Sequence, residues 1–289
     1  MAFPNTMKTA VLLAAIGGLL VLVGSALGGT GGAVIGLVLG LVIVGGSYWF
    51  SDRIAVRAAG AHEVSIAEAP RLHATVAELA ERAGLPKPRV YVSPAAQPNA
   101  VATGRNPRHA AVAVTEGLLT QCPPDEVRGV LAHELAHIRN RDILIGSVAA
   151  AVATGISFVA NMALFAGMFG GGDDEDGPSP AVALLMALLA PMAATVLQMA
   201  LSRSREFEAD RVGATIAGDP EPLARALERL GRVAQVTPFD VNPAQASAYI
   251  VNPLTGRKVS FARLFLTHPP VEERVERLRS MADGHARSA

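Results

Sequence analysis

The chain has 289 residues, of which 51% are apolar and only 17% are charged. Soluble domains carry about 25% charged residues, so this composition is too apolar for an ordinary cytosolic enzyme or a disordered protein. Lysine plus arginine equals aspartate plus glutamate, at 25 each. This balance argues against a nucleic-acid partner, because nucleic-acid binders carry a basic excess. The single cysteine, Cys122, excludes an internal disulfide and fits a reducing compartment.

Two uncharged segments near the N-terminus predict a helical hairpin in a lipid bilayer. Residues 10–27 and 33–50 are each just long enough to cross a hydrocarbon core of about 30 Å, and the glycine-rich turn 28–32 separates them. Tyr48 and Trp49 end the second segment, as expected at a membrane–water interface. A cleaved signal peptide is the alternative, but a second apolar segment follows at once and no clear cleavage site precedes it.

Two longer uncharged segments, 143–169 and 181–201, predict a second transmembrane hairpin around an acidic loop. Pro191 interrupts the second of them, which membrane helices tolerate. The alternative is a pair of buried helices in a soluble core, although such long uncharged segments rarely fit inside a soluble domain of this size.

The distribution of basic residues predicts the orientation of the four spans. Arginines lie where the spans meet the longer polar segments, whereas the connecting loops 28–32 and 170–180 contain no lysine or arginine. These arginines are Arg53, Arg57, Arg139, Arg141, Arg203 and Arg205. The positive-inside rule therefore places both termini and both polar segments in the cytoplasm, at the plasma (bacterial inner) membrane.

The chain accordingly divides into an N-terminal transmembrane hairpin (8–50), a polar segment (51–142), a second hairpin (143–201) and a polar tail (202–289). Apolar periodicity predicts a helix through Leu72 that ends at Gly84. The further predicted elements are strands at 89–92, 99–103 and 111–114, a helix from Pro124 toward Asp142, and tail helices at 203–217, 221–235 and 270–282. The expected fold is mainly α with a small antiparallel or mixed sheet (α+β).

The helix from Pro124 contains the sequence His133-Glu134-Leu135-Ala136-His137. Histidines four residues apart lie on one face of a helix, so both can bind one Zn²⁺. Glu134 is placed to act on water that the metal acidifies, which is the chemistry of peptide hydrolysis by zinc proteases. The alternative is a surface helix with two solvated histidines. The extended zincin pattern does not continue, because Asn140 and Ile143 occupy its later positions.

A catalytic zinc site needs a third protein ligand. Glu206 and Asp210 follow the fourth predicted span and share a helix face. Their mutual repulsion would be relieved by a cation, so we propose Glu206 as the third ligand, with Asp210 accepting a hydrogen bond from a ligand histidine. An ordinary charged helix is an equal alternative on spacing alone. The second hairpin would return the chain to the same side of the membrane, which brings Glu206 to the depth of His137.

Several motifs in order give the chain a resemblance to the HtpX membrane metalloproteases and, more distantly, to the zinc CAAX prenyl proteases. These motifs are 99–105 (NAVATGR), 133–142 (HELAHIRNRD), 202–210 (SRSREFEAD), 251–256 (VNPLTG) and 267–270 (THPP) with Arg274 beyond. The resemblance covers nearly the whole chain. It implies a cytoplasmic zincin-type protease domain and one Zn²⁺ per chain, held by His133, His137 and Glu206.

The resemblance also implies roles that the residues alone do not reveal. Glu134 would be the general base, His268 would stabilise the oxyanion, and Arg274 would hold the carboxylates of the site. The strand pair containing Asn99 and Ala100, and Ala111, Val112 and Ala113, would offer an edge to an extended substrate, by main-chain pairing that demands little of the substrate sequence. The alternative is that residues 111–114 form an ordinary core strand.

The implied function is quality control of unfolded or damaged membrane proteins, with self-cleavage, by a zinc endopeptidase at the cytoplasmic membrane surface. A dedicated processing protease with one regulated substrate is a second hypothesis. A non-catalytic membrane scaffold with a vestigial zinc site is a third, which the intact Glu134 argues against. A transporter would require ionisable groups inside the spans, and these spans contain none.

Overall fold

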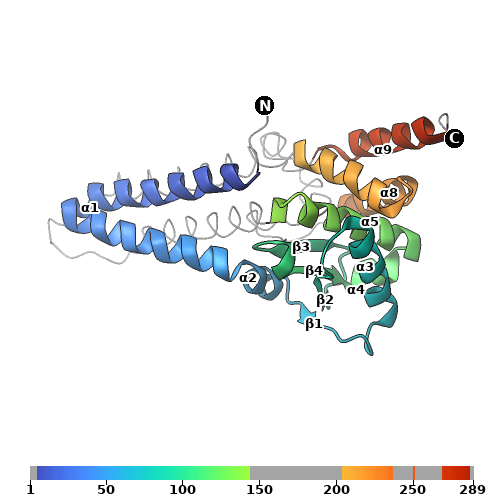
Figure 1. Cartoon of the computed structure of the whole chain (residues 1–289), viewed down its shortest axis with the longest axis horizontal. Helices are drawn as coiled ribbons and strands as arrows, with labels where there is room; N and C mark the ends of the chain where they lie inside the picture. The colour runs from blue at the N-terminus through green and yellow to red at the C-terminus, as the bar shows by residue number, and fades with distance from the viewer. Residues whose placement is uncertain (1–4, 144–203, 237–249, 251–268, 287–289) are drawn as a thin grey trace.

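The computed structural model describes residues 5–143, 204–236, 250 and 269–286. Within these ranges the chain is mainly helical and contains a single small sheet, so the predicted α+β class is confirmed. Figure 1 shows a long helical arm that extends away from a body containing the sheet and the remaining helices. Nearly all of the second predicted transmembrane hairpin lies outside the described residues.

The helical arm is α1, Asn5–Trp49, which folds back on itself in Figure 1. Gly29 has a φ of +56°, and it lies in the glycine-rich turn predicted at 28–32. The short helix α2, Ser51–Ala58, follows and connects the arm to the sheet. No helix in the described part of the chain is long and apolar enough to qualify as a membrane span.

The sheet has four strands in the order β1-β2-β4-β3, namely β1 His62–Glu63, β2 Arg89–Ser93, β4 Ala110–Thr115 and β3 Ala100–Gly104. The β2–β4 pair is parallel, and the other two pairs are antiparallel. The three predicted strands are present to within one or two residues, whereas the two-residue β1 was not predicted. In this arrangement β4 is an interior strand, and β3 pairs on one side only among the described residues.

Helices cover both faces of the sheet. The helices α3, Pro70–Ala83, and α5, Pro124–Arg139, pack on one face, and α2 packs on the other. As predicted, α3 ends at Gly84, whose left-handed conformation (φ +68°) suits a residue without a Cβ atom. The short α4, Glu116–Gln121, leads from β4 toward α5.

Three helices from the tail complete the body. They span residues 204–217 (hereafter helix 204–217), Glu221–Val236 (α8) and Val271–Ala286 (α9), close to the predicted bounds. Helix α8 packs between α5 and α9. Because the sheet and α3 cover one side of α5 and the tail helices cover the other, α5 is almost wholly buried, and its residues lie at the centre of one continuous core.

Candidate active site

The two histidines of α5 point their ring nitrogens toward a common position. His133 and His137 are one helical turn apart, so they share the face of α5 toward the tail helices. Their Nε2 atoms are 3.2 Å apart, and the rings meet edge to face. His133 is only 1% exposed and the His137 side chain is 16% exposed, so bulk water can reach the pair only from the side of His137.

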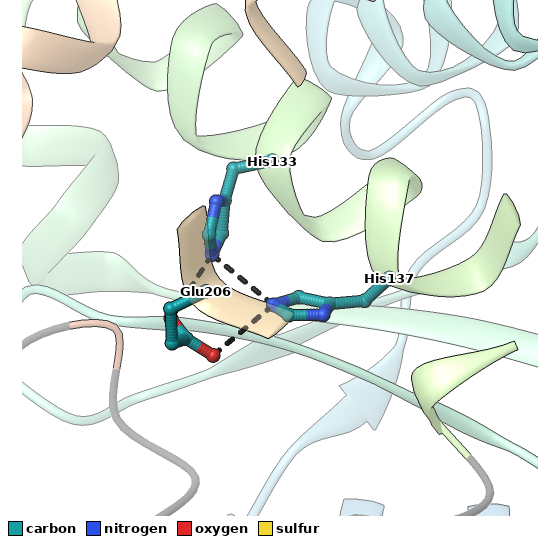
Figure 2. Close-up of side chains that lie close together, drawn as sticks. All are labelled: His133, His137 and Glu206. Carbon is teal, nitrogen blue, oxygen red and sulfur yellow. Dashed lines mark hydrogen bonds and ion pairs between the residues drawn. The ribbon is translucent and has the colours of Figure 1, made fainter. Parts of the chain in front are cut away.

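Glu206 reaches the same position from helix 204–217. Its Oε2 lies 3.7 Å from Nε2 of His133, and its Oε1 lies 3.6 Å from Nε2 of His137. Figure 2 shows the three side chains converging on one point from two elements that are far apart in the sequence. One ligand atom from each residue fits within a span of 4.8 Å.

These three residues fit a zinc ion in both geometry and chemistry. Two ligand atoms bonded at about 2.0–2.1 Å to a tetrahedral centre stand roughly 3.4 Å apart, close to the separations of 3.2, 3.6 and 3.7 Å seen here. Two imidazole nitrogens and one carboxylate oxygen form a donor set typical of catalytic zinc, which leaves the fourth position open for water or substrate.

A buried carboxylate supports His133 from behind. Nδ1 of His133 lies 2.9 Å from Oδ1 of Asp210, so a proton on Nδ1 leaves Nε2 with the lone pair that a metal requires. Arg274, which is fully buried on α9, donates Nε and Nη2 to the two oxygens of Asp210 at 2.8 and 2.7 Å. Burial alone would raise the pKa of the Asp210 carboxyl, but Arg274 and His133 hold it below its usual range.

Arg274 also connects Asp210 to the remainder of the site. Its Nη1 lies 3.5 Å from Oε2 of Glu206 and donates to the carbonyl oxygen of Ile250 at 2.8 Å. One guanidinium therefore faces two carboxylates of helix 204–217. The charge of Arg274 offsets the cost of burying these carboxylates so close to each other.

A different carboxylate supports His137. Nδ1 of His137 lies 3.3 Å from Oδ2 of Asp142, which follows the end of α5. Burial lowers the pKa of His137, but the hydrogen bond with Asp142 and the charges of Glu206 and Glu134 outweigh it and raise the pKa to about 9. His137 therefore binds a proton tightly whenever no metal takes its place.

Glu134 lies beside the histidines and is held by the sheet. Its Oε2 accepts a 2.6 Å hydrogen bond from the backbone N–H of Ala102 in β3. Burial raises the pKa of the Glu134 carboxyl, although His133 and His137 act in the opposite direction. A buried carboxyl with a raised pKa, fixed next to a set of metal ligands, is suited to accept and release a proton.

Of the other predicted site residues, His268 lies outside the described residues, and Asn99 is engaged within the fold. Oδ1 of Asn99 accepts from the backbone N–H of Ile250 at 3.1 Å, and its backbone N–H donates to Oγ1 of Thr115. In the structure these contacts tie the start of β3 to β4 and to the tail.

The predicted substrate edge requires a correction. Ala111, Val112 and Ala113 lie on β4, which pairs with β2 on one side and β3 on the other. Both of its edges are occupied, so these three residues have no free main-chain groups to offer a substrate. Among the described residues, the open edge next to α5 belongs to β3, which contains Ala100.

Sequence reasoning missed two contacts of the site. Asp142 is five residues beyond His137, a spacing that does not share a helix face, so no helical pattern could indicate it. Its contact depends on α5 ending at Arg139 and on Arg141, whose φ of +60° turns the chain back. The N–H of Ala102 has no sequence signal, because any residue but proline supplies one.

Comparisons with known proteins identify the family of the chain. The model of peptidase family M48 matches residues 67–282. The chain is 51% identical over 279 residues to the "Protease HtpX homolog" of Syntrophobacter fumaroxidans, covering 95% of this chain and 98% of that one. It is 50% identical over 283 residues to the protein of the same name from Persephonella marina, covering 96% and 98%.

Among solved structures, Ste24p of S. mikatae matches with a TM-score of 0.51 at 22% identity. The match covers 95% of this chain but 65% of the Ste24p chain, so it shows a shared fold within a longer protein. Together with the family match and the relatives at about 50% identity, these findings place the chain in peptidase family M48, among the HtpX-like metalloproteases.

Proposed function

We propose that the protein is a membrane-integral, zinc-dependent endopeptidase that cleaves unfolded or damaged membrane proteins at the cytoplasmic surface. One observation carries the catalytic part of this proposal. Two imidazole nitrogens and a carboxylate converge at distances that suit tetrahedral zinc, with the buried carboxyl of Glu134 alongside. His133, His137 and Glu206 would hold the ion.

Bound Zn²⁺ would supply a Lewis acid that acidifies water and polarises the peptide carbonyl. The chain itself supplies the proton transfers. Glu134 takes a proton from the attacking water and passes it to the departing amine, and the N–H of Ala102 keeps its carboxylate in place meanwhile. Asp210 and Asp142 hold the histidines with Nε2 forward, and Arg274 keeps Asp210 ionised.

The open edge of β3 is the proposed substrate site. In an antiparallel pair, alternate residues direct their N–H groups away from the partner strand, and the N–H of Ala102 points away from β4 toward Glu134. An extended peptide added along this edge would therefore run beside the proposed general base. Pairing through the main chain demands little of the side chains, which suits the cleavage of unrelated unfolded proteins.

The membrane setting is supported by the surface of α1. Its second half exposes a concentrated group of large apolar side chains, with Leu41 66% exposed. The group consists of Val34, Ile35, Leu37, Val38, Leu39, Leu41 and Val42. Soluble monomers rarely expose such patches, and the hydrocarbon of a bilayer is the partner that this chemistry fits.

The arm is tied to the substrate strand. Arg105, just after β3, donates Nη1 to the carbonyl oxygen of Trp49 at 3.2 Å, and its guanidinium lies 4.7 Å from the centre of the Trp49 ring. Because Trp49 ends α1, this contact would place β3 near the membrane surface. Unfolded segments of membrane proteins that leave or fail to enter the bilayer would then lie close to the β3 edge.

The catalytic proposal is tested by comparing wild type with Glu134→Gln in detergent, loaded with zinc, on several unrelated unfolded proteins. We expect Glu134→Gln to retain zinc and to cleave about 10²–10⁴-fold more slowly, since it removes the general base. Glu81→Gln, on the exposed surface of α3, is the matched control and should cleave like wild type. The same gels report self-cleavage.

Other outcomes would contradict the proposal or favour one of the alternative functions. Equal cleavage by wild type and Glu134→Gln would remove Glu134 as the base. Zinc binding without cleavage by any variant would favour the scaffold hypothesis. Cleavage confined to a single substrate would favour a dedicated processing protease.

The orientation is tested separately with single cysteines in a Cys122→Ala background. A membrane-impermeant maleimide should label Thr30→Cys in intact cells, and should label Ser65→Cys only after the membrane is opened. Labelling of Ser65→Cys in intact cells would contradict a cytoplasmic site.

A further inference from the structure

Two helix backbones approach unusually closely beside the metal ligands. A Cβ atom placed on Gly213, in helix 204–217, would lie 2.8 Å from Cα and 3.0 Å from N of His133. Carbon atoms in favourable contact are about 3.5–4.0 Å apart, so no side chain fits at this position. At this crossing the backbone of Gly213 packs directly against the backbone of α5.

The neighbouring atoms leave no way to accommodate a side chain except by moving a helix. All three of the nearest atoms belong to the backbone of α5, the third being the carbonyl carbon of Ala132 at 3.2 Å. A change of rotamer therefore relieves nothing. Glycine in the middle of a helix costs about 1 kcal/mol relative to alanine, so its presence at residue 213 calls for a packing reason such as this one.

The contact lies within the metal site. Glu206, Asp210 and Gly213 occupy positions i, i+4 and i+7 of one helix, which places them on a single face. His133 lies across the contact on α5. The separation of the two backbones at residue 213 thus sets how far the carboxylates of Glu206 and Asp210 stand from the His133 ring, now 3.7 Å and 2.9 Å away.

We propose that Gly213 is a positioning residue for the metal site, which fixes the distance between the histidine half on α5 and the carboxylate half on helix 204–217. This inference rests on the proposed zinc function. A side chain at residue 213 must push the helices apart by about 0.5–1 Å to reach normal contact, whereas metal ligands must stay within about 0.2 Å of their ideal distances.

A second glycine on α5 provides a matched control. A Cβ on Gly129 would lie 2.7 Å from N and 3.0 Å from Cα of Leu223, so the steric conflict is similar and again involves backbone. Gly129 is one turn before His133 on α5, but it faces α8, on which we place no site residue. Gly129→Ala should disturb helix packing without separating the two halves of the metal site.

The experiment uses the full chain in detergent and compares wild type, Gly213→Ala and Gly129→Ala. The measurements are the unfolding midpoint of the metal-free protein, the Zn²⁺ affinity by chelator competition, and the absorption spectrum with Co²⁺. We expect both variants to lose stability. Only Gly213→Ala should bind Zn²⁺ about 10–100-fold more weakly and show a changed Co²⁺ spectrum, as for other losses of support around a metal.

A second variant decides the matter if Gly213→Ala does not fold. Glu206→Asp withdraws the carboxylate by one methylene without touching the helix contact, so it imitates the displacement alone. We expect it to weaken Zn²⁺ binding by a similar factor, with a smaller loss of metal-free stability than in Gly213→Ala, because it lengthens the contact with Arg274 but leaves the helix contact intact. Wild-type affinity in Glu206→Asp would show that the site tolerates such a displacement and would overturn the inference.

The remaining outcomes separate this inference from the function on which it rests. A folded Gly213→Ala with wild-type affinity and spectrum overturns the positioning role, and so does an equal loss of affinity in Gly129→Ala. Failure of the wild type itself to bind Zn²⁺ would instead overturn the proposed function, and the positioning role with it.

Discussion

The two histidines of the site are supported by very different parts of the molecule. His133 faces Asp210, which accepts hydrogen bonds from the fully buried Arg274. Arg274 lies on α9, 64 residues after Asp210 in the sequence. His137 faces Asp142, which lies just five residues away beyond the end of the same helix. The same carboxylate–imidazole contact is thus built once from distant elements and once from a local turn.

The two supports differ in the contacts that hold each aspartate in position. Asp210 receives two hydrogen bonds from a planar guanidinium, an arrangement that fixes both the position and the plane of the carboxylate. Asp142 is positioned by the path of the chain through Arg141, a non-glycine residue in the left-handed region, and interacts electrostatically with Arg205 of helix 204–217. We therefore expect the His133 support to be the stiffer and more costly one to lose.

The largest effect should come from removing the distant support. Arg274→Met leaves Asp210 and Glu206 buried without their shared cation, and breaking such a pair costs about 3–5 kcal/mol in the free energy of unfolding. Urea denaturation of the metal-free protein measures this loss. Arg279→Met, on the same helix but pairing with Glu221 and Glu228 at the surface, should cost far less because solvent screens those charges. Equal losses would contradict the assigned role of burial.

The next effect compares the two carboxylates directly. Asp210→Asn and Asp142→Asn should each weaken Zn²⁺ binding within the 10–100-fold range of about 1–3 kcal/mol that outer ligands of metal sites contribute. We expect Asp210→Asn at the upper end, because it also leaves Arg274 facing a neutral group, and Asp142→Asn at the lower end. Chelator competition on both variants, side by side, tests this order. The reverse order would show that the local turn is the stiffer support.

The pH dependence of Zn²⁺ affinity should report on the contact between Asp142 and His137. With the pKa of His137 raised to about 9, Zn²⁺ must displace a proton at any lower pH. Between about pH 9 and 6.5, apparent affinity should therefore fall about tenfold for each unit of decreasing pH. In Asp142→Asn the pKa of His137 should fall, because Glu206 and Glu134 still raise it but Asp142 no longer does, so that affinity becomes flat from a lower pH than in wild type. Parallel profiles in the two proteins would contradict the assignment of Asp142.

The smallest effect should come from the turn itself. A non-glycine residue in the left-handed region costs about 1–2 kcal/mol, and glycine removes this strain at an entropic cost of about 0.5–1 kcal/mol. Arg141→Gly should thus stabilise the protein by no more than about 1.5 kcal/mol, and Arg141→Val should destabilise it. Thermal unfolding of both variants tests the sign. A loss of stability in Arg141→Gly would show that the arginine side chain matters more than its backbone conformation.

Much of the fold follows from local patterns in the sequence. The apolar period that ends at Gly84 predicts α3, and the Pro-Asp-Glu start at 124 predicts α5. Three strands were expected near their observed bounds. The strand order was not, because pairing between β2 and β4 is decided by packing around α5 and α2 rather than by either strand alone.

Some features of the candidate site can also be predicted from local sequence patterns, whereas others depend on contacts between distant elements. The spacing of His133 and His137 is a property of one helix, so the sequence indicates their shared face. The position of Glu206 beside them depends on two helices meeting, for which the resemblance to a known family was the stronger guide. Asp142, Gly213 and the Ala102 N–H could not be predicted, since each acts through backbone geometry that no side-chain pattern records.

The distance in sequence between Asp210 and Arg274 also has a consequence for the chain while it is being made. The histidines leave the ribosome first, Glu206 follows, and Arg274 comes 64 residues after Asp210. At about 5–20 residues per second, that last stretch takes roughly 3–13 s. Until α9 can dock, Asp210 and Glu206 lack their counter-charge and His133 lacks its fixed support. We therefore expect the nascent protease to remain inert toward the ribosome, its neighbours and its own unfinished chain until α9 has left the ribosome and docked.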